Sequence, residues 1–449
     1  NNVRELVSLL AAFQVEVEDL GDGILELQPP EKPSMYIKSA GGWAFVASDI
    51  VHLDTLPAQP EQQLAALLTE YDVAARVAVQ KIPAEYRQLA VEQLRSGLEE
   101  GLERAEDEDD ETYEMRRRWA ESQMENVVRM IEEIDDVTVG WSVDAADART
   151  FIDLTYMVIP GSRLDKVFAS AAANSHTNYP GFYQPDAAIC VTVASHTDPA
   201  LIQDDLEQMR AMMKAVKQQI AKEIDDEDDD LPADPAARET IKQAAYDLID
   251  AFMATAETGH VEGGAVVNMY PESLTIVAGG QVHDTSKIES ALKKLESVAQ
   301  REPDFPGVTW NADQHAGVAF HTIAAPVEED DSDGRQLFGD TVDISVGIGE
   351  QSVFVGVGRE NLAALKGVID ASANNPGKDV PLAEFLIALG PIMETAAALE
   401  DDEQEKMITQ MIADMLRTEA QGRDHIRIVG QPIEHGLRYR IEAEEGVLR

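Results

Sequence analysis

The amino-acid sequence predicts an α+β protein built from duplicated units of antiparallel sheet backed by long helices. Three observations support this class. Apolar and polar residues alternate over many short segments, as in half-buried strands, and apolar residues recur at helical spacing over longer ones. The two patterns also follow one another in a repeated order, and a strand that buries one face needs another layer to cover it.

The segment 341–370 shows both patterns most clearly. Apolar residues alternate with polar or small ones from Val342 to Ile348 and again from Val353 to Val357, which predicts a β-hairpin. From Leu362 onward the apolar spacing lengthens to that of one helix face. The glycines of this hairpin do not have the spacing of a phosphate-binding loop, and we interpret them as sites of close packing or bulges.

The predicted elements follow in order along the chain. Residues 1–14 predict a short helix, and 24–27, 35–37 and 42–48 predict strands, with Gly41-Gly42 forming a tight turn. A strand at 71–79, helices on both sides of 106–111, and strands at 137–143 and 150–159 come next. Ser162 and Asp165 then resemble a capping box that opens a short helix. There follow a strand at 187–193, helices on both sides of 225–230, strands at 263–269 and 273–280, and a helix whose Ser286 and Glu289 match a capping box. Strands at 308–310 and 318–324, the segment 341–370, a strand at 382–389, helices around 400–405, and strands at 426–429 and 437–441 complete the chain.

One order of elements therefore occurs three times. A strand leads to a proline and a long helix, an acidic run interrupts the helix, and a hairpin closes the unit. The prolines are Pro83, Pro199 and Pro391, and the acidic runs are Glu106–Glu111, Asp225–Asp230 and Glu400–Glu405. We expect each proline in the first helical turn, where its missing N–H costs least.

The order of elements also suggests two domains. The order that begins at Gly42 is matched by the order that begins at Thr341, which we interpret as an internal duplication with an inserted middle unit. The predicted domains are 1–185 and 186–449. The second comprises a middle unit, 186–303, and a second copy of the N-terminal plan, 304–449.

The charge balance limits the partners of the protein. Lys and Arg number 36 against 84 Asp and Glu, a formal net charge of −48. Such a surface repels nucleic-acid phosphates and anionic membranes. No apolar stretch approaches the ~18 residues needed to span a bilayer, so membrane insertion is not expected. A homo-oligomer or a basic protein partner remains compatible with the composition, as does an acidic surface suited to saline surroundings.

Known catalytic patterns are missing from the sequence. The nine histidines contain no pair at i, i+4, and there is no Gly-x-Ser-x-Gly motif. Cys190 is the single cysteine, which excludes an internal disulfide, and its apolar neighbours predict a buried thiol. Carboxylates are too numerous for an acid/base pair to be identified. We therefore assign no catalytic residues, and an enzyme is the less favoured class.

One run of carboxylates has the spacing of a metal-binding loop. Glu329, Asp331 and Asp333 occupy positions 1, 3 and 5 of an EF-hand-like calcium loop, with Gly334 at position 6 and Asp340 at position 12. Position 1 is normally Asp, and no helical pattern precedes it. The alternative is a solvated linker. The sequence indicates no other cofactor.

Several stretches resemble a family of secreted proteins of unknown function from planctomycete bacteria. They are GWAFVAS, YDVAARVAVQKIPAEYR, VGWSVDAADARTFIDLTYMVIPGSRL, GHVEGGA and the closing EEGVLR. The resemblance covers nearly the whole chain and implies export to the cell envelope, but it supplies no catalytic residues. The chain begins without Met, for which a removed secretory signal or a cleaved tag would account. A periplasmic or extracellular location is the expectation.

Together these observations predict a non-catalytic envelope or extracellular protein that binds or assembles through its sheets or acidic loops. A periplasmic carrier of an apolar ligand, held in a groove between a sheet and a helix, is the alternative. A Met-rich helical segment at 209–213 could line such a groove, although core packing also explains it. A hydrolase is the third class.

Overall fold

The computed structural model describes residues 15–29, 33–102, 104, 110–225, 232, 234–303, 305–328, 330–420 and 422–448. The chain divides into two compact units, Asn1–Glu70 and Tyr71–Arg449. The predicted helix at 1–14 lies outside the described residues. Among the described residues, no helix combines the length and apolarity that crossing a membrane requires.

The first unit contains an antiparallel sheet of four strands in sequence order. Its elements are β1 (Glu16–Gly21), β2 (Ile24–Gln28), β3 (Met35–Ala40), β4 (Trp43–Ala47) and α2 (Pro60–Glu70). Leu27, Ile37 and Leu53 are buried and form its small core. Gly41 and Gly42 have φ values of +58° and +86°, so the tight turn predicted for this pair is confirmed.

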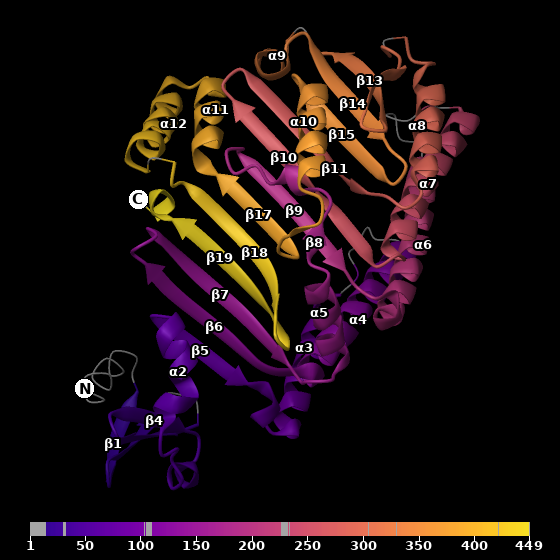
Figure 1. Cartoon of the computed structure of the whole chain (residues 1–449). Helices are drawn as coiled ribbons and strands as arrows, with labels where there is room; N and C mark the ends of the chain where they lie inside the picture. The colour runs from indigo at the N-terminus through magenta and orange to yellow at the C-terminus, as the bar shows by residue number, and fades with distance from the viewer. Residues whose placement is uncertain are drawn as a thin grey trace. The chain divides into compact units, whose positions relative to one another are not determined.

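The second unit contains one antiparallel sheet of 13 strands, shown in Figure 1. In spatial order the strands are β12 (Thr309–His315), β13 (Val318–Pro326), β14 (Thr341–Ile348), β15 (Ser352–Gly358), β11 (Ser273–Gln281), β10 (His260–Tyr270), β9 (Ile189–His196), β17 (Ala383–Ala388), β18 (His425–Ile433), β19 (Gly436–Glu444), β7 (Arg149–Val158), β6 (Ile134–Asp144) and β5 (Val73–Ala78). A separate ribbon pairs β8 (His176–Thr177) with β16 (Lys378–Asp379). The α+β class predicted from the sequence is confirmed.

The repeated order of elements is also confirmed, because each repeat is a three-stranded meander with two helices in its first connection. The repeats are β5-α3-α4-β6-β7, β9-α6-α7-β10-β11 and β17-α11-α12-β18-β19. The helices are α3 (Ala84–Gly101), α4 (Asp110–Glu133), α6 (Gln203–Asp225), α7 (Pro235–Ala256), α11 (Leu389–Leu399) and α12 (Glu403–Met415). Each predicted acidic run falls between the two helices of its pair or at their ends. Most of the first two runs lies outside the described residues.

The three prolines lie at or next to helix starts. Pro391 is the third residue of α11, and Pro199 is the first residue of the short 3₁₀ turn η5 (Pro199–Leu201) that precedes α6. Pro83 comes directly before α3, and its carbonyl oxygen accepts from the amide of Tyr86. Pro83 therefore lies one residue outside the predicted turn, at a position where its missing N–H likewise costs nothing.

The predicted boundary at 185/186 does not coincide with the division of the structure. The sheet crosses it, because β17 and β19 from the end of the chain pair with β9 and β7 respectively. The order of elements that begins at Gly42 does match the order that begins at Thr341, because in both a hairpin precedes a helix, a strand, two helices and a closing hairpin. The two opening hairpins, however, lie in different sheets. The first hairpin belongs to the separate sheet of the first unit, whereas β14 and β15 belong to the 13-stranded sheet.

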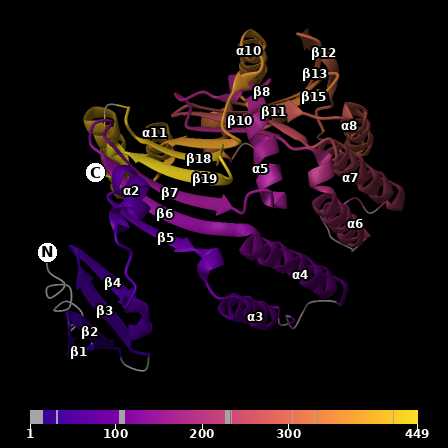
Figure 2. The same ribbon diagram turned by 60° about the horizontal axis from the view of Figure 1, so that its bottom comes forward.

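Helices cover the sheet unevenly. α5 (Arg163–Ala173) and α10 (Asn361–Asn374) cross one face of the sheet, as Figure 1 shows, and we call this the helix-bearing face. The helices α3, α4, α6, α7 and α8 (Thr285–Ala299) form a row along one end of the strands, each contacting the next (Figures 1 and 2). A short helix, α9 (Ser332–Phe338), precedes β14.

The main core lies beneath α10 on the helix-bearing face. Leu365 and Val368 of α10 pack against Phe354, Val277 and Val266 of the sheet, and all five side chains are buried. Gly347 and Gly356 permit this packing. A Cβ at Gly347 would lie 2.6 Å from the ring of Phe320, and one at Gly356 would lie 2.9 Å from Leu365. The predicted role of these hairpin glycines in close packing is confirmed.

Two capping predictions have different outcomes. Ser162 caps α5, since its hydroxyl accepts from the amide of Asp165, as predicted. The capping box at Ser286 and Glu289 is wrong. Helix α8 begins at Thr285 after Asp284, and the Ser286 hydroxyl donates to the Asp284 carboxylate instead.

The hydrogen bond between Asp165, in the first turn of α5, and His435 predicts a raised pKa for His435. Asp165 hydrogen-bonds to His435 Nδ1 at 2.9 Å, and this bond raises the pKa of His435 above its usual value. A raised folded-state pKa contributes stability that is present at low pH and is lost as the pH rises through that value. We expect an NMR titration to show the His435 pKa above about 6.5, and to show it moving back toward that value in Asp165→Asn. The pKa of His425, whose acceptor is Glu444, should not change. An unaltered His435 titration in the variant would contradict the prediction.

Candidate functional site

The two faces of the 13-stranded sheet differ in chemistry. Residues directly opposite in an antiparallel pair point to the same face, so the register defines rows of side chains across the sheet. One such row, from β5 to β17, consists of Val73, Trp141, Ile152, Ile441, Ile428 and Phe385. We call the face that carries this row the apolar face. It is opposite the helix-bearing face.

The apolar face carries no charge. Among the paired strand positions from β13 to β5, none of its residues is Asp, Glu, Lys or Arg. It is also open to solvent, because twelve of its large hydrophobic side chains are at least 36% exposed. They are Val73, Val77, Val139, Trp141, Val143, Ile152, Val261, Ile276, Val355, Ile428, Tyr439 and Ile441. Monomeric proteins rarely expose a contiguous apolar patch of this extent without using it.

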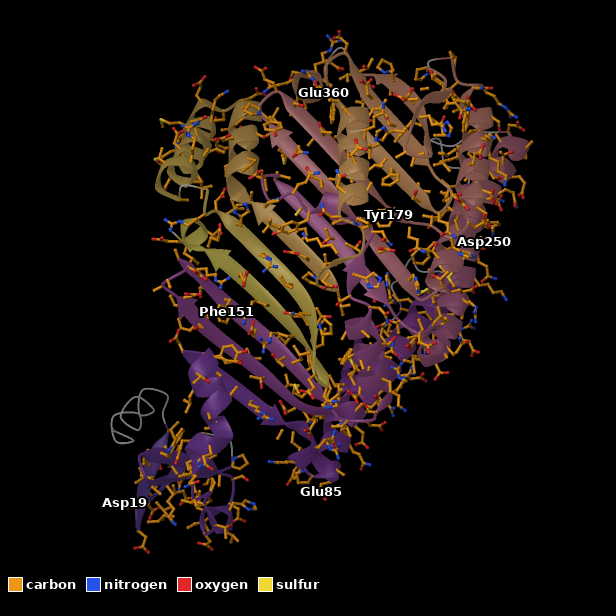
Figure 3. The ribbon with its side chains drawn as sticks, in the orientation of Figure 1. Asp19, Glu85, Phe151, Tyr179, Asp250 and Glu360 are labelled. Carbon is orange, nitrogen blue, oxygen red and sulfur yellow. The ribbon has the colours of Figure 1, made fainter. Side chains whose placement is uncertain are left out.

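The helix-bearing face buries charged groups in the same strands. Asp153 is fully buried. Its carboxylate accepts hydrogen bonds from Nε and Nη2 of Arg440, both at 2.7 Å, and from the Tyr71 hydroxyl at 2.8 Å. The Arg440 guanidinium in turn lies 4.0 Å from the ring centroid of Phe151, a residue labelled in Figure 3. The hydrogen bond from Arg440 to Asp153 raises the pKa of Arg440, so the guanidinium stays charged. The bidentate geometry fixes both side chains.

The network continues onto β17 and β18. Glu384 accepts from Arg427 at 2.6 Å, and Glu442 accepts from Arg427 and Arg149 at 3.2 Å. Both carboxylates are less than 10% exposed. Through these ion pairs the two buried carboxylates connect neighbouring strands of the sheet.

The predicted calcium loop is replaced by a helix start. Asp331 caps α9, its carboxylate accepting from the amide of Gly334 at 2.8 Å, and Asp333 lies in the first helical turn. Asp340 lies beyond the helix, and Glu329 lies outside the described residues. Gly334 has no positive φ, whereas the calcium loop needs a sharp turn there. Asp331 and Asp333 thus belong to the start of α9, and the described members of the set form no group of converging ligand atoms.

The Met-rich helix does not enclose a dry cavity. A groove of about 640 Å³ between α4 and α6 includes Met209 and Met212, beside residues that are mainly of polar or charged type. Met212 is 40% exposed.

A pocket of about 590 Å³ on the helix-bearing face gathers three histidines. His196 ends β9 and His260 begins β10 directly opposite it, and their rings stack at 4.5 Å between centroids. His176 of β8 meets His196 edge-on at 4.9 Å. Gly259, with φ +70°, brings the chain against the carbonyl of Thr197, so the two strand ends lie close together.

Glu262 forms the acidic wall of the same pocket. It is 6% exposed and accepts from the Asn178 amide at 2.8 Å and from the Thr177 hydroxyl at 3.2 Å. Burial and the charge of Glu262 raise the pKa of Tyr179, labelled in Figure 3, to about 12. Burial lowers the pKa of His196, and this effect outweighs the opposing charge of Glu262.

Sequence reasoning did not identify this pocket. The spacing His260-x-Glu262 within a strand pattern places both side chains on one face, and this signal is visible in the sequence. His196 and His176 could not be added without knowing that β9 pairs with β10 and that β8 lies nearby. The apolar face could be anticipated strand by strand, but the absence of a covering layer could not.

Comparison of the chain with known protein families, curated proteins and solved structures found no match.

Proposed function

We propose that this chain is a non-catalytic binding and assembly protein, and that two copies join through their apolar faces. The observation that carries the proposal is an uncharged sheet face, open to solvent, in a chain with a net charge of −48. A periplasmic or extracellular location is part of the proposal, supported by the resemblance of the sequence to exported proteins. The acidic surface and the single buried cysteine are compatible with that location.

The dimensions of the face support a second copy as the occupant. Twelve strands about 4.8 Å apart extend over roughly 50 Å, and about three outward positions per strand cover about 20 Å, which gives roughly 1,000 Å². A stable interface needs about 800 Å² from each partner. A single acyl chain or small ligand would cover only a fraction of this surface. Two such faces, rich in Val and Ile, can pack as the layers of a β-sandwich do.

The charge of the chain adds a constraint that can be measured. Two copies of a −48 chain repel one another, and salt screens this repulsion over about 8–10 Å at 0.1–0.15 M. Hydrophobic association between the apolar faces is not weakened by screening. Added salt should therefore favour the dimer, whereas an association held by acidic loops and a basic partner would weaken.

Light scattering coupled to size-exclusion chromatography tests the proposal directly. We expect the wild-type chain to be dimeric and the double variant Ile152→Asp/Ile441→Asp to be monomeric. These residues are opposite one another on β7 and β19, and each is 46% exposed. In a dimer of this variant, the two introduced carboxylates of one copy would be buried against the two of the other. The free-energy cost of burying these charges would far exceed that of the lost apolar contacts.

A matched control comes from α12. Met407 and Met411 are 67% and 65% exposed, so Met407→Asp/Met411→Asp makes the same change in charge and apolar surface off the sheet. The control should remain dimeric. A dimer that persists in the Ile152/Ile441 variant would overturn the proposal. So would a wild-type monomer whose apolar face binds a fluorescent fatty acid, which would identify a carrier instead.

A further inference from the structure

The histidine pocket contains a buried polar atom without a partner. His196 is 7% exposed, and its Nε2 forms no hydrogen bond within the described part of the chain. The nearest carboxylate oxygen, Oε1 of Glu262, is 3.8 Å away, beyond hydrogen-bond range. Burying a nitrogen without a hydrogen-bond partner destabilises a fold. Its position in a pocket lined by His176, His260 and Glu262 points to a ligand that completes the set.

The donors in the pocket are those of a transition-metal site. Three imidazoles and one carboxylate are a ligand set that suits Zn²⁺, whereas Ca²⁺ and Mg²⁺ prefer oxygen ligands alone. Carboxylates that bind a metal usually accept further hydrogen bonds from the protein, and Glu262 already does so. Its Oε2 accepts from Thr177 and from the Asn178 amide, and its Oε1 accepts from the Asn178 side chain at 3.2 Å and faces His196.

We propose that this pocket binds one Zn²⁺ ion through His176, His196, His260 and Oε1 of Glu262. In the conformation described, the imidazoles stack and do not converge on one point. His260 is exposed and His176 is half-buried, so both can turn about their side-chain torsions while His196 and Glu262 stay fixed. The ion would link the β8–β16 ribbon to the antiparallel strands β9 and β10 of the 13-stranded sheet. It therefore acts as a structural tether.

A second cluster on the sheet does not compete for this assignment. Asp424, His425 and Glu444 have potential ligand atoms within 4.8 Å of one another, and no other such convergent group occurs within the described residues. However, both nitrogens of His425 already have partners, Glu444 at 2.9 Å and the carbonyl of Pro185 at 3.0 Å. Asp424 accepts from the amide of Gly390. These hydrogen bonds account for the cluster without an ion.

Calorimetric titration of the whole chain of 449 residues, treated with a chelator, with Zn²⁺ tests the site. We expect one tight equivalent of Zn²⁺ in about 0.15 M salt, where exposed carboxylates are screened. An excess of Ca²⁺ should not displace it, and the melting temperature should rise by mass action. His260→Gln and His176→Gln should each weaken binding about tenfold or more. His315→Gln, which removes an imidazole paired with Asp370 elsewhere, should leave binding unchanged.

The variants separate this site from the acidic surface. His260→Gln changes an exposed side chain and His176→Gln a half-buried one, so both variants should fold normally. Weaker Zn²⁺ binding by these variants therefore cannot be attributed to misfolding. Equal binding by the wild type and both variants would assign the Zn²⁺ to surface carboxylates and overturn the proposal. Absence of Zn²⁺ binding would overturn it as well. Co²⁺ substitution provides a spectroscopic check, because the absorption of Co²⁺ reports nitrogen ligands and tetrahedral geometry.

Discussion

Replacing Asp153 with alanine is expected to lower the free energy of unfolding by about 3 kcal/mol, the lower end of the range for breaking a buried ion pair. The variant leaves the Arg440 guanidinium and the Tyr71 hydroxyl without the acceptor that both use. Asp153 lies on β7 and Arg440 on the adjacent β19, so the pair joins two repeats. Denaturant unfolding followed by circular dichroism measures the loss.

Two further variants establish the cause of that loss. Asp147→Ala removes an exposed carboxylate paired with Arg149 and should cost about 0–1 kcal/mol. Arg440→Met added to Asp153→Ala should recover part of the stability, because it removes the charge left unpaired. If Asp153→Ala unfolds at the same denaturant concentration as Asp147→Ala, the network contributes little.

Replacing Phe320 with alanine is expected to cost about 3–5 kcal/mol. Its ring is fully buried in the main core and lies against Gly347 of the neighbouring strand, which has no side chain to fill the resulting space. Phe252→Ala on α7 removes the same atoms from a side chain that is 56% exposed and should cost under about 1 kcal/mol. Equal losses for the two variants would show that the region around Phe320 collapses to fill the cavity.

The sequence predicts the repeated blocks because their signals are local. Strand alternation, a proline at a helix start and an acidic break between helices all depend on residues close together in the chain. The capping of α5 by Ser162 and the close packing at Gly347 were likewise predictable, since a cap residue or a glycine between β-branched neighbours has few other uses.

The failures concern residues whose neighbours come from distant segments. The carboxylates near Asp331 fit a calcium loop by spacing alone, but a seven-residue helix uses Asp331 as its cap. The boundary at 185/186 fell between two repeats, yet the strands that join them come from the end of the chain. The histidine pocket has the same origin, because three separate strands contribute its rings.

The position of the last repeat in the sheet has a consequence for the synthesis of the protein. β17, β18 and β19 lie between β9 and β7, although they are made last. While the chain is still emerging from the ribosome, the two flanking blocks of strands have no partner through which to join, and β7 and β9 each present an unpaired edge. Such edges invite pairing with a neighbouring nascent chain, and they stay open until residues 383–444 have been released. In a chain terminated before Ala383, the remaining strands of the 13-stranded sheet would form two separate blocks.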